Sequence, residues 1–117
     1  MQYILMAYVN EAGWPKMTPA EQQQGAAAYM AFGEALAKAG VAKGSNRLQP
    51  TSAATTVRVA NGKSQVLDGP YADSKEQLGG YFLIDVADLD AAISWAARCP
   101  ASAHGVVEVR PIWSMPA

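Results

Sequence analysis

Ionisable residues gather in the stretch between positions 68 and 76. Asp68, Asp73, Lys75 and Glu76 are the densest charged group in a chain of which only 16% is charged. Either Asp68 or Glu76 has the chemistry of a general base, provided that a dry crevice favours its protonated form. The alternative is turn chemistry, with Asp68 in an Asx-type turn, Asp73 or Ser74 as a cap, and Lys75 and Glu76 solvated or paired.

Arg110 shares one face of a predicted last strand with Glu108 and stands among apolar residues. Burying a guanidinium without a partner is costly. We therefore expect one of two arrangements. Arg110 forms a structural ion pair with Glu108 or Asp68, or it anchors a carboxylate or similar anion through two parallel donors. Lys75 is a second candidate for contacting such an anion.

His104 is the only histidine, and it stands in a predicted loop before the last strand. As a catalytic acid or base it needs a carboxylate partner, Asp68 or Glu108, brought near by the fold; otherwise it is simply solvated. Cys99 and His104 are the only soft metal ligands, too few for a zinc site within one chain. We expect no metal. We also expect no organic cofactor, because the chain lacks a Walker-type glycine loop, a dinucleotide fingerprint and a Gly-x-Ser-x-Gly elbow.

Three tyrosines, Tyr8, Tyr71 and Tyr81, could line an apolar crevice with hydroxyl groups at their tips. The alternative is packing in the core and in an interface, where the ring is buried and the hydroxyl finds a partner. The candidate ligand-binding residues are thus Tyr8, Tyr71, Lys75, Tyr81 and Arg110. The candidate catalytic residues are Asp68, Glu76 and His104.

The elements that must position these residues begin with a strand over residues 3–9. Both of its alternating faces are apolar, so it must be covered on both sides. The sequence Thr18–Glu21 predicts a helix start with a capping box and a proline at the first helical position. The helix should end at Gly40, with Val41 closing a Schellman motif. Its expected core-facing stripe, in which two small residues would allow close contact with a sheet, is Tyr29, Gly33, Leu36 and Ala37.

The second half of the chain contains a strong hairpin signal. Two β-branched runs, residues 55–59 and 65–67, flank Asn61-Gly62. Ser74 and Gln77 suggest one capped helical turn in the loop that follows. The remaining expected elements are a weak strand at 43–48, a strand at 81–86, a helix capped by Asp88 and ended by Pro100, and a last strand at 106–113. The stripe expected on this second helix is Leu89, Ala92, Ile93 and Ala96.

The order strand, helix, strand, hairpin, strand, helix, strand predicts an α+β fold. Two strand–helix–strand units with an inserted β-hairpin make a ferredoxin-like sandwich. Two helices cover one face of such a sheet, yet the strands at 3–9 and 81–86 are apolar on both faces. A second copy of the chain is the simplest cover. We therefore expect a homodimer through the sheet face, with a ligand crevice between or beside the two sheets.

The stretch Asp68–Tyr81 resembles the motif of the YCII-related proteins, in the branch named for the sequence Asp-Gly-Pro-Phe. Matching pieces elsewhere are Thr55–Arg58, Trp95–Pro100 and Val107–Pro111. The resemblance spans nearly the whole chain and implies a single domain over residues 1–117 that forms a dimeric α+β barrel. It implies no particular reaction. Members are often encoded beside extracytoplasmic-function sigma factors, which implies a sigma-factor-related partner as an alternative.

Two positions depart from the pattern of that family. Tyr71 stands where the branch has Phe, which keeps the aromatic ring and adds a hydroxyl group. Asn46-Arg47 stands where an acidic residue is expected before Leu48. This second departure weakens any mechanism that would use a carboxylate there.

Composition narrows the class of protein. The 117 residues are about one domain's worth, and 50% hydrophobic content excludes disorder. With a net charge of -1 and no basic run, nucleic acid is not an expected partner. The longest apolar run is far shorter than the roughly 18 residues of a membrane span. No signal-peptide pattern is present, and a single cysteine fits a cytoplasmic protein.

The sequence leaves open whether the protein is an enzyme. One hypothesis is a cofactor-free enzyme that binds a small anionic or aromatic molecule in the dimer crevice and uses acid–base chemistry. A second is a non-catalytic ligand-binding or regulatory module that acts in a sigma-factor system. A third is a purely structural dimer.

Overall fold

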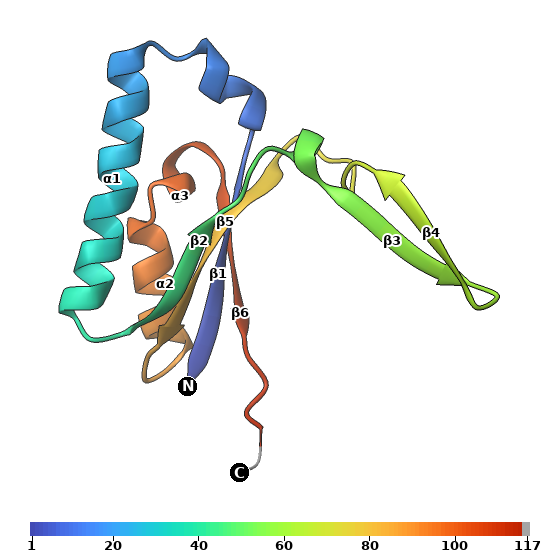
Figure 1. Ribbon diagram of the computed structural model, residues 1–117. Coiled ribbons are helices and arrows are strands. Elements are labelled where there is room, and N and C mark those ends of the chain that lie inside the picture. The colour runs from blue at the N-terminus through green and yellow to red at the C-terminus, as the bar shows by residue number, and fades with distance from the viewer. Residues whose placement is uncertain (116–117) are drawn as a thin grey trace.

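The computed structural model describes residues 1–115. Its main sheet has four strands in the order β2-β5-β1-β6, with every neighbouring pair antiparallel. These strands are β1 (Gln2–Val9), β2 (Ala42–Arg47), β5 (Gln77–Asp85) and β6 (Val106–Pro111). The helices α1 (Pro19–Lys38), α2 (Leu89–Arg98) and α3 (Ala101–His104) lie on one side of this sheet (Figure 1). This arrangement is the predicted ferredoxin-like α+β fold.

Local sequence sets both ends of α1. The Thr18 hydroxyl accepts from the Glu21 N–H at 3.1 Å, and the Glu21 carboxylate accepts from the Thr18 N–H at 2.9 Å. This is the predicted capping box, and the Thr18 N–H bond lowers the pKa of the Glu21 carboxyl. At the other end, Gly40 has φ +74° and the Val41 N–H donates to the Leu36 carbonyl at 3.2 Å. The predicted Schellman closure is therefore confirmed.

The core fills the space between the helices and the covered face of the sheet. Leu5 and Ile84 are completely buried, and Leu36 of α1 is 2% exposed. Phe32 of α1 packs edge-on against Phe82 of β5, with ring centroids 4.9 Å apart, an arrangement that aromatic pairs favour. Each such side chain contributes about 1.5–3 kcal/mol on burial, so this layer is the main source of stability.

The face of α1 that meets the sheet agrees with the predicted stripe only in part, because Leu36 is buried and Tyr29 packs against the core as predicted. The buried residues are Phe32 and Leu36, whereas Ala37 is exposed. A Cβ built at Gly33 would have no atom within 4 Å. The prediction that Gly33 and Ala37 allow close helix–sheet contact is wrong, because the large ring of Phe32 fills that interface.

The second helix begins as predicted but buries less of its stripe. The Asp88 carboxylate accepts from the Ala91 N–H at 2.9 Å. Of the predicted stripe, Ala92 and Ala96 are buried, while Leu89 and Ile93 are 48% and 50% exposed. After Pro100 the chain forms α3, so the sequence prediction of a loop around His104 is wrong.

The segment 69–76 contains bends and no helical turn. The Ser74 hydroxyl donates to the Glu76 carbonyl, and the Gln77 side-chain amide donates to the Ser74 carbonyl at 2.7 Å. These bonds hold a bend rather than the predicted capped turn, and β5 begins at Gln77. Gly79 and Gly80 therefore lie inside a strand. The last strand ends at Pro111, two residues earlier than predicted.

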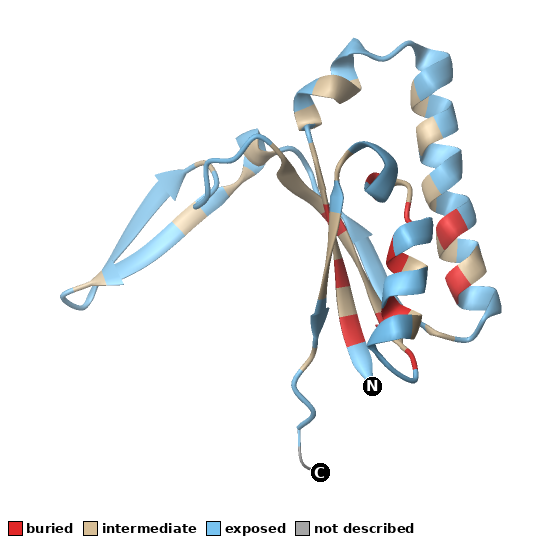
Figure 2. Ribbon diagram, turned by 180° about the vertical axis from the view of Figure 1, so that it is seen from behind, coloured by how far each residue is buried: buried red, intermediate tan, exposed pale blue. Residues whose placement is uncertain are grey.

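A second, two-stranded sheet projects from the body. β3 (Thr55–Ala60) and β4 (Lys63–Asp68) pair along their length. Asn61-Gly62 joins them as predicted, with φ of +52° and +74°, as a type I′ turn requires. We call Thr55–Asp68 the arm. Figures 1 and 2 show the arm extending away from the main sheet, on the side opposite the helices.

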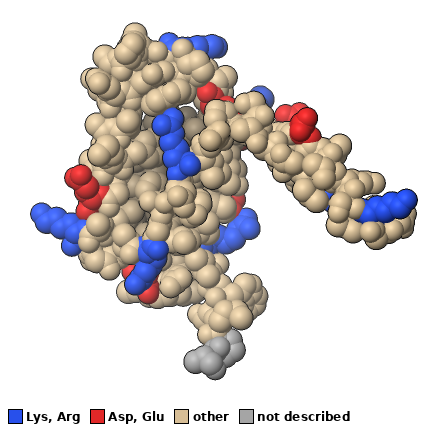
Figure 3. Space-filling view, viewed as in Figure 1, with Lys and Arg blue, Asp and Glu red and all other residues tan. Residues whose placement is uncertain are grey.

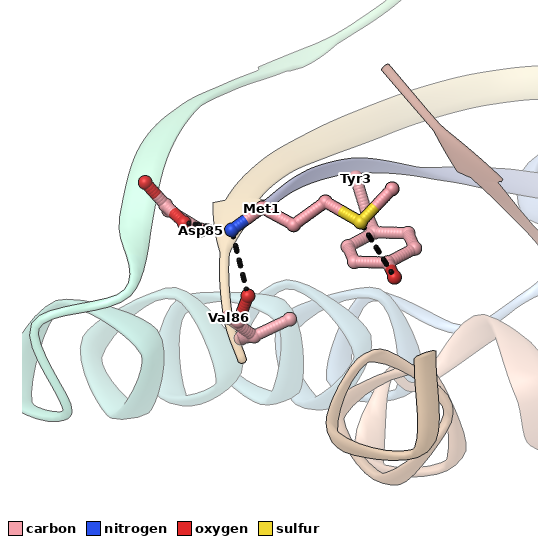
Figure 4. Close-up of polar contacts among 4 residues, drawn as sticks. All are labelled: Met1, Tyr3, Asp85 and Val86. Carbon is pink, nitrogen blue, oxygen red and sulfur yellow. Dashed lines mark hydrogen bonds and ion pairs between the residues drawn. The ribbon is translucent and has the colours of Figure 1, made fainter. Parts of the chain in front are cut away.

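The chain start is tied to the end of β5. The Met1 ammonium group donates to the Asp85 carboxylate at 2.9 Å and to the Val86 carbonyl at 3.0 Å (Figure 4). The hydrogen bond from this ammonium group lowers the pKa of the Asp85 carboxyl. The Tyr3 hydroxyl donates to the Met1 sulfur at 3.3 Å beside it.

Charge is spread thinly over the molecule. In Figure 3 basic and acidic side chains are scattered over the visible face, and neither sign forms a patch there. Within residues 1–115, no helix combines the length and the apolar character that crossing a membrane demands.

Candidate functional site

One face of the main sheet carries none of the helices found in residues 1–115. Directly paired residues of antiparallel strands project from the same side, so the strand register identifies the members of this face. Tyr3, Leu5 and Ala7 are buried in the core, and the alternate residues of β1 therefore point away from the helices. We call this surface the open face. Its members include Ile4, Met6, Tyr8, Asn46, Tyr81, Leu83, Glu108 and Arg110.

The centre of the open face is apolar. Ile4 pairs with Leu83, and Met6 pairs with Tyr81. These residues and Tyr8 are half-buried although no helix covers them, because neighbouring side chains shield one another. A solvated face of an antiparallel sheet is usually polar. The composition of the open face is therefore that of a surface which another body covers.

A polar pair lies at one side of this apolar centre. The Asn46 side-chain amide donates to the Tyr81 hydroxyl oxygen at 2.8 Å, and the two residues are register partners across β2 and β5. A phenol oxygen that accepts one bond still has its own O–H to donate. Tyr81 can therefore offer a directed donor to a molecule lying on the open face.

Arg110 and Glu108 lie at the other side, on β6. An Arg110 guanidinium nitrogen donates to a Glu108 carboxylate oxygen at 2.6 Å, which confirms the predicted structural pair. The side chains are 67% and 42% exposed, and a pair this exposed contributes only about 0–1 kcal/mol to stability. A guanidinium has five N–H donors, so the contact leaves donors for an anionic ligand.

The structure does not bring the predicted catalytic residues together within one chain. Asp68 ends β4 opposite Thr55 in the arm, and Glu76 immediately precedes β5. His104 ends α3, which lies with the other helices on the covered side (Figures 1 and 2). Among residues 1–115, no hydrogen bond or ion pair joins any two of these three side chains or joins His104 to Glu108. Their catalytic roles stay predictions.

The predicted ligand-binding residues divide between two regions. Tyr71 and Lys75 lie in segment 69–76, which joins β4 to β5 and is not part of the strands that form the open face. Tyr71 is 80% exposed, and the Arg58 guanidinium lies 5.9 Å from its ring centroid, within range of a cation–π contact. The residues that do lie on the open face are Tyr8, Tyr81 and Arg110.

Sequence analysis missed Asn46 and Met6 as site residues. The sequence marks Asn46 only as a departure from a family pattern, and its partner Tyr81 is 35 positions away. Pairing across such a separation carries no local signal. Met6 could have been predicted from the sequence, because the alternation of β1 places it on one face with Tyr8.

A polar clasp anchors the root of the arm. Glu11 belongs to the short 3₁₀ helix η1 (Glu11–Lys16), and its carboxylate accepts from the Thr51 N–H at 3.0 Å and from the Thr51 hydroxyl. Thr51 opens η2 (Thr51–Ala53), just before β3. The Gln77 side chain accepts from the Glu11 N–H at 3.1 Å. The segments that enter and leave the arm are thus held by the same residue.

Hollows on the described surface lie away from these residues. One of about 280 Å³ is lined by residues 47–50. Another of about 410 Å³ lies between α2, α3 and β6, and its lining includes Ile93, Ala96, Val106 and Val109. The predicted site residues line neither hollow. Neither of these two hollows makes an enclosed site on the open face.

Two ionisable groups of the core take no part in this site. Burial raises the pKa of the Cys99 thiol and of the Tyr29 hydroxyl. Both groups therefore stay protonated and act as packing side chains. Among residues 1–115, no three His, Cys, Asp or Glu side chains are grouped closely enough to hold a metal ion.

A ferredoxin-like α+β domain with one uncovered apolar sheet face is the class of protein that these observations define. The family model of the YCII-related domain matches residues 1–116, and the chain therefore belongs to the YCII-related family, as its central motif indicated. An uncharacterised protein of Rhizobium meliloti (strain 1021) is 36% identical over 115 residues, which cover 96% of this chain and 92% of that protein.

A solved structure shares the fold. It is 5-chloro-2-hydroxyhydroquinone dehydrochlorinase (TftG) from Burkholderia phenoliruptrix AC1100, in complex with 2,5-dihydroxybenzoquinone. The comparison gives a TM-score of 0.55 and 14% sequence identity, and covers 99% of this chain and 96% of that one. At this identity the similarity establishes the fold alone.

Proposed function

We propose that the open face binds a small planar molecule with oxygen or carboxylate substituents, and that a second copy of the chain encloses it. The observation that carries this proposal is an uncovered apolar surface with directed donors on both sides. Ile4, Met6 and Leu83 supply the apolar floor. Tyr81 and Arg110 supply an O–H group and a guanidinium. Small-molecule sites combine such apolar lining with a few placed polar groups.

The ligand of the structural neighbour supports this ligand class. The molecule in complex with TftG, 2,5-dihydroxybenzoquinone, is a flat ring with four oxygen atoms. A flat ring suits the apolar floor of the open face. Its oxygens suit the phenol and guanidinium donors, and the guanidinium bonds are the stronger where the oxygen is ionised. Hydroxyquinones and aromatic acids are therefore the compounds of first choice.

Binding is the function that the geometry supports best, and acid–base catalysis is proposed in addition. The strand register places two carboxylates on the open face, Glu108 and Asp85, and they are already engaged by Arg110 and by the Met1 ammonium group. Asp68, Glu76 and His104 come from separate regions of one chain. Turnover of a bound hydroxyquinone that is unchanged when each of these three is replaced would exclude their catalytic roles.

The enclosing copy is proposed to join through the open face. Such a homodimer covers the apolar side chains that the helices leave uncovered and turns a flat surface into a crevice. We propose that the protein is cytoplasmic, since Cys99 is a free thiol and reducing compartments preserve free thiols.

A thermal-shift screen tests the binding site. Hydroxybenzoquinones and benzoates are added to wild type, Arg110→Met and Tyr81→Phe. Ligand at a hundred times its dissociation constant stabilises wild type by about 2.7 kcal/mol per site, and both variants should lose most of this shift. The matched control is Arg98→Met, an arginine on the helix side that stacks on Trp95 at 4.4 Å and should keep the shift.

Two results would count against this site. An equal loss in Arg98→Met would mean that the effect is not specific to the open face. If no compound shifts wild type, the small-molecule proposal fails, and the sigma-factor-related regulatory module becomes the hypothesis to test by capture of a protein partner.

A further inference from the structure

The arm is a hairpin that its own chain does not support. Beyond its internal ladder, its hydrogen bonds to the rest of the chain lie at the root, where the Gly69 N–H donates to the Ala54 carbonyl at 2.8 Å and the Thr56 hydroxyl donates to the Gly69 carbonyl at 2.7 Å. An isolated two-stranded hairpin is marginally stable in water. The arm extends about 20 Å from this root, judged by six residues per strand.

One face of the arm carries three valines that nothing in residues 1–115 covers. Val57 pairs directly with Val66, so both project from the same side, and Val59 follows two residues along the same strand. These three side chains are 61%, 62% and 65% exposed. In Figure 3 most of the arm surface is uncharged. A contiguous apolar strip on a projecting element marks an interaction surface.

The chain as a whole exposes more surface than a compact monomer of its size. Its accessible area is 8357 Å², against about 6,100 Å² expected for a folded monomer of 12.3 kDa. Its radius of gyration is 16.3 Å, against about 13 Å for a compact domain of 117 residues. The excess area is about 2,300 Å², well above the roughly 800 Å² per partner that a standard stable interface buries.

The arm and the open face lie on the same side of the main sheet. Figures 1 and 2 both show the helices on one side of this sheet and the arm on the other. The hydrogen bonds between Glu11 and Thr51 hold the root of the arm in place, so the body of the same chain fixes the angle between arm and sheet. A partner that enters this angle meets two apolar surfaces at once, the open face and the valine strip.

A second copy of this chain is the partner that fits. In a twofold-symmetric dimer each copy presents the same two apolar surfaces to the other. Each copy then occupies the space between the arm and the sheet of its partner. With a net charge of -1 per chain, two copies repel only weakly. A smaller ligand would leave the valine strip exposed.

We infer that the arm is a dimer clasp: each arm lies with its valine strip against the body of the second copy and closes one end of that copy's open-face site. This inference rests on the homodimer of the proposed function. It adds that residues 55–68 of one copy are part of the enclosure of the other, so a single chain has an incomplete site.

Paired lysine substitutions on the arm test the clasp. Val57→Lys with Val66→Lys adds two charges to the valine strip, and Gln65→Lys adds one such charge to the opposite face of β4. Light scattering over a concentration series should show a dimer for wild type and for Gln65→Lys. The double variant should have a dissociation constant higher by about 100-fold. Unchanged far-ultraviolet circular dichroism will show that its body is folded.

Cross-linking locates the arm directly. Wild-type protein labelled with ¹⁵N is mixed with unlabelled protein and treated with an amine-reactive cross-linker. Lys63 stands at the tip of the arm, and mixed-isotope links should join it to a lysine outside residues 55–68 of the other copy. A double variant whose dissociation constant equals that of wild type, or a dimer that gives no such link, overturns the clasp and leaves the sheet-face homodimer standing. A monomeric wild type overturns both.

Discussion

Close backbone approaches at single glycines hold the sheet and the loops beside it together. A Cβ at Gly105 would collide with the Tyr8 carbonyl oxygen and lie 3.1 Å from a Val9 methyl group. Since the added Cβ would collide with a backbone atom, no side-chain rotation can relieve the overlap. At Gly33, a half-buried position of α1, the same added atom meets nothing within 4 Å. The two positions therefore respond in opposite directions to the same substitution.

Gly105→Ala should destabilise the protein by about 1–3 kcal/mol, because the junction of α3 and β6 must shift away from β1. Gly33→Ala should stabilise it by about 0.5–1 kcal/mol, because alanine removes the entropic penalty of a glycine inside a helix. Urea unfolding of both variants and wild type measures these changes. A destabilised Gly33→Ala would show that α1 lies closer to a neighbour than the structure has it.

The Asp85 carboxylate should make stability depend on pH. The bound ammonium group lowers its folded-state pKa from the ordinary value of 3.8, so its contribution is present above that value and is lost as pH falls through the folded pKa. For protein that begins at Met1, lowering the pH from about 6 to below 4 should therefore reduce the melting temperature of wild type more than that of Asp85→Asn. The difference should be small, since the pair is exposed.

The control for the Asp85 experiment is Asp73→Asn, an exposed carboxylate in segment 69–76 with no ion pair among the described residues. It should follow wild type across the pH range. Parallel curves for wild type and Asp85→Asn would show that the ammonium–carboxylate contact does not persist in solution.

Helix ends and the tight turn of the hairpin are the features that the sequence predicts best. The capping box at Thr18, the Schellman closure at Gly40 and the Asn61-Gly62 hairpin each depend on residues a few positions apart. In each case side-chain chemistry alone selects the backbone conformation. Such features are determined before any tertiary contact forms.

Thr18→Ala tests how much the cap contributes. It removes the bond that the hydroxyl accepts from the Glu21 N–H and should destabilise the protein by about 1 kcal/mol. Gln23→Ala, an exposed site in the same helix, should change the stability by a few tenths of a kcal/mol at most. Equal effects of the two substitutions in chemical denaturation would mean that the first turn of α1 frays in solution.

Elements set by distant contacts escaped prediction. The sequence predicted that Gly33 and Ala37 lie against the sheet. Phe32 lies there instead, because its ring packs against the ring of Phe82, with the two centroids 4.9 Å apart. Segment 69–76 resembles a helix start, yet Gln77 is recruited into β5 by pairing with Val9. The candidate site followed the same division. Tyr8 was predicted from its residue type, an aromatic ring with a hydroxyl group, whereas Asn46 depends on its pairing with Tyr81, 35 positions away.

At the scale of the whole molecule, one sheet has two very different faces. The covered face holds the fully buried Leu5 and Ile84, and the open face holds apolar side chains that are only shielded by one another. The sequence predicted that both faces of the sheet are apolar, because both alternating sets of residues in β1 are apolar. It gave no sign that the arm would project on the uncovered side, since the direction of a hairpin depends on how its root is held.

The proposed homodimer predicts that stability depends on protein concentration. If folding and association are coupled, a hundredfold increase in concentration, from about 1 to 100 μM, should raise the melting temperature by mass action. Leu83→Lys places a charge in the centre of the open face and should abolish this dependence. Ile93→Lys carries the same change on the helix side, where Ile93 is 50% exposed, and should retain it. A melting temperature of wild type that is constant over this range would mean that the open face meets water in solution, and its apolar residues would then need another partner.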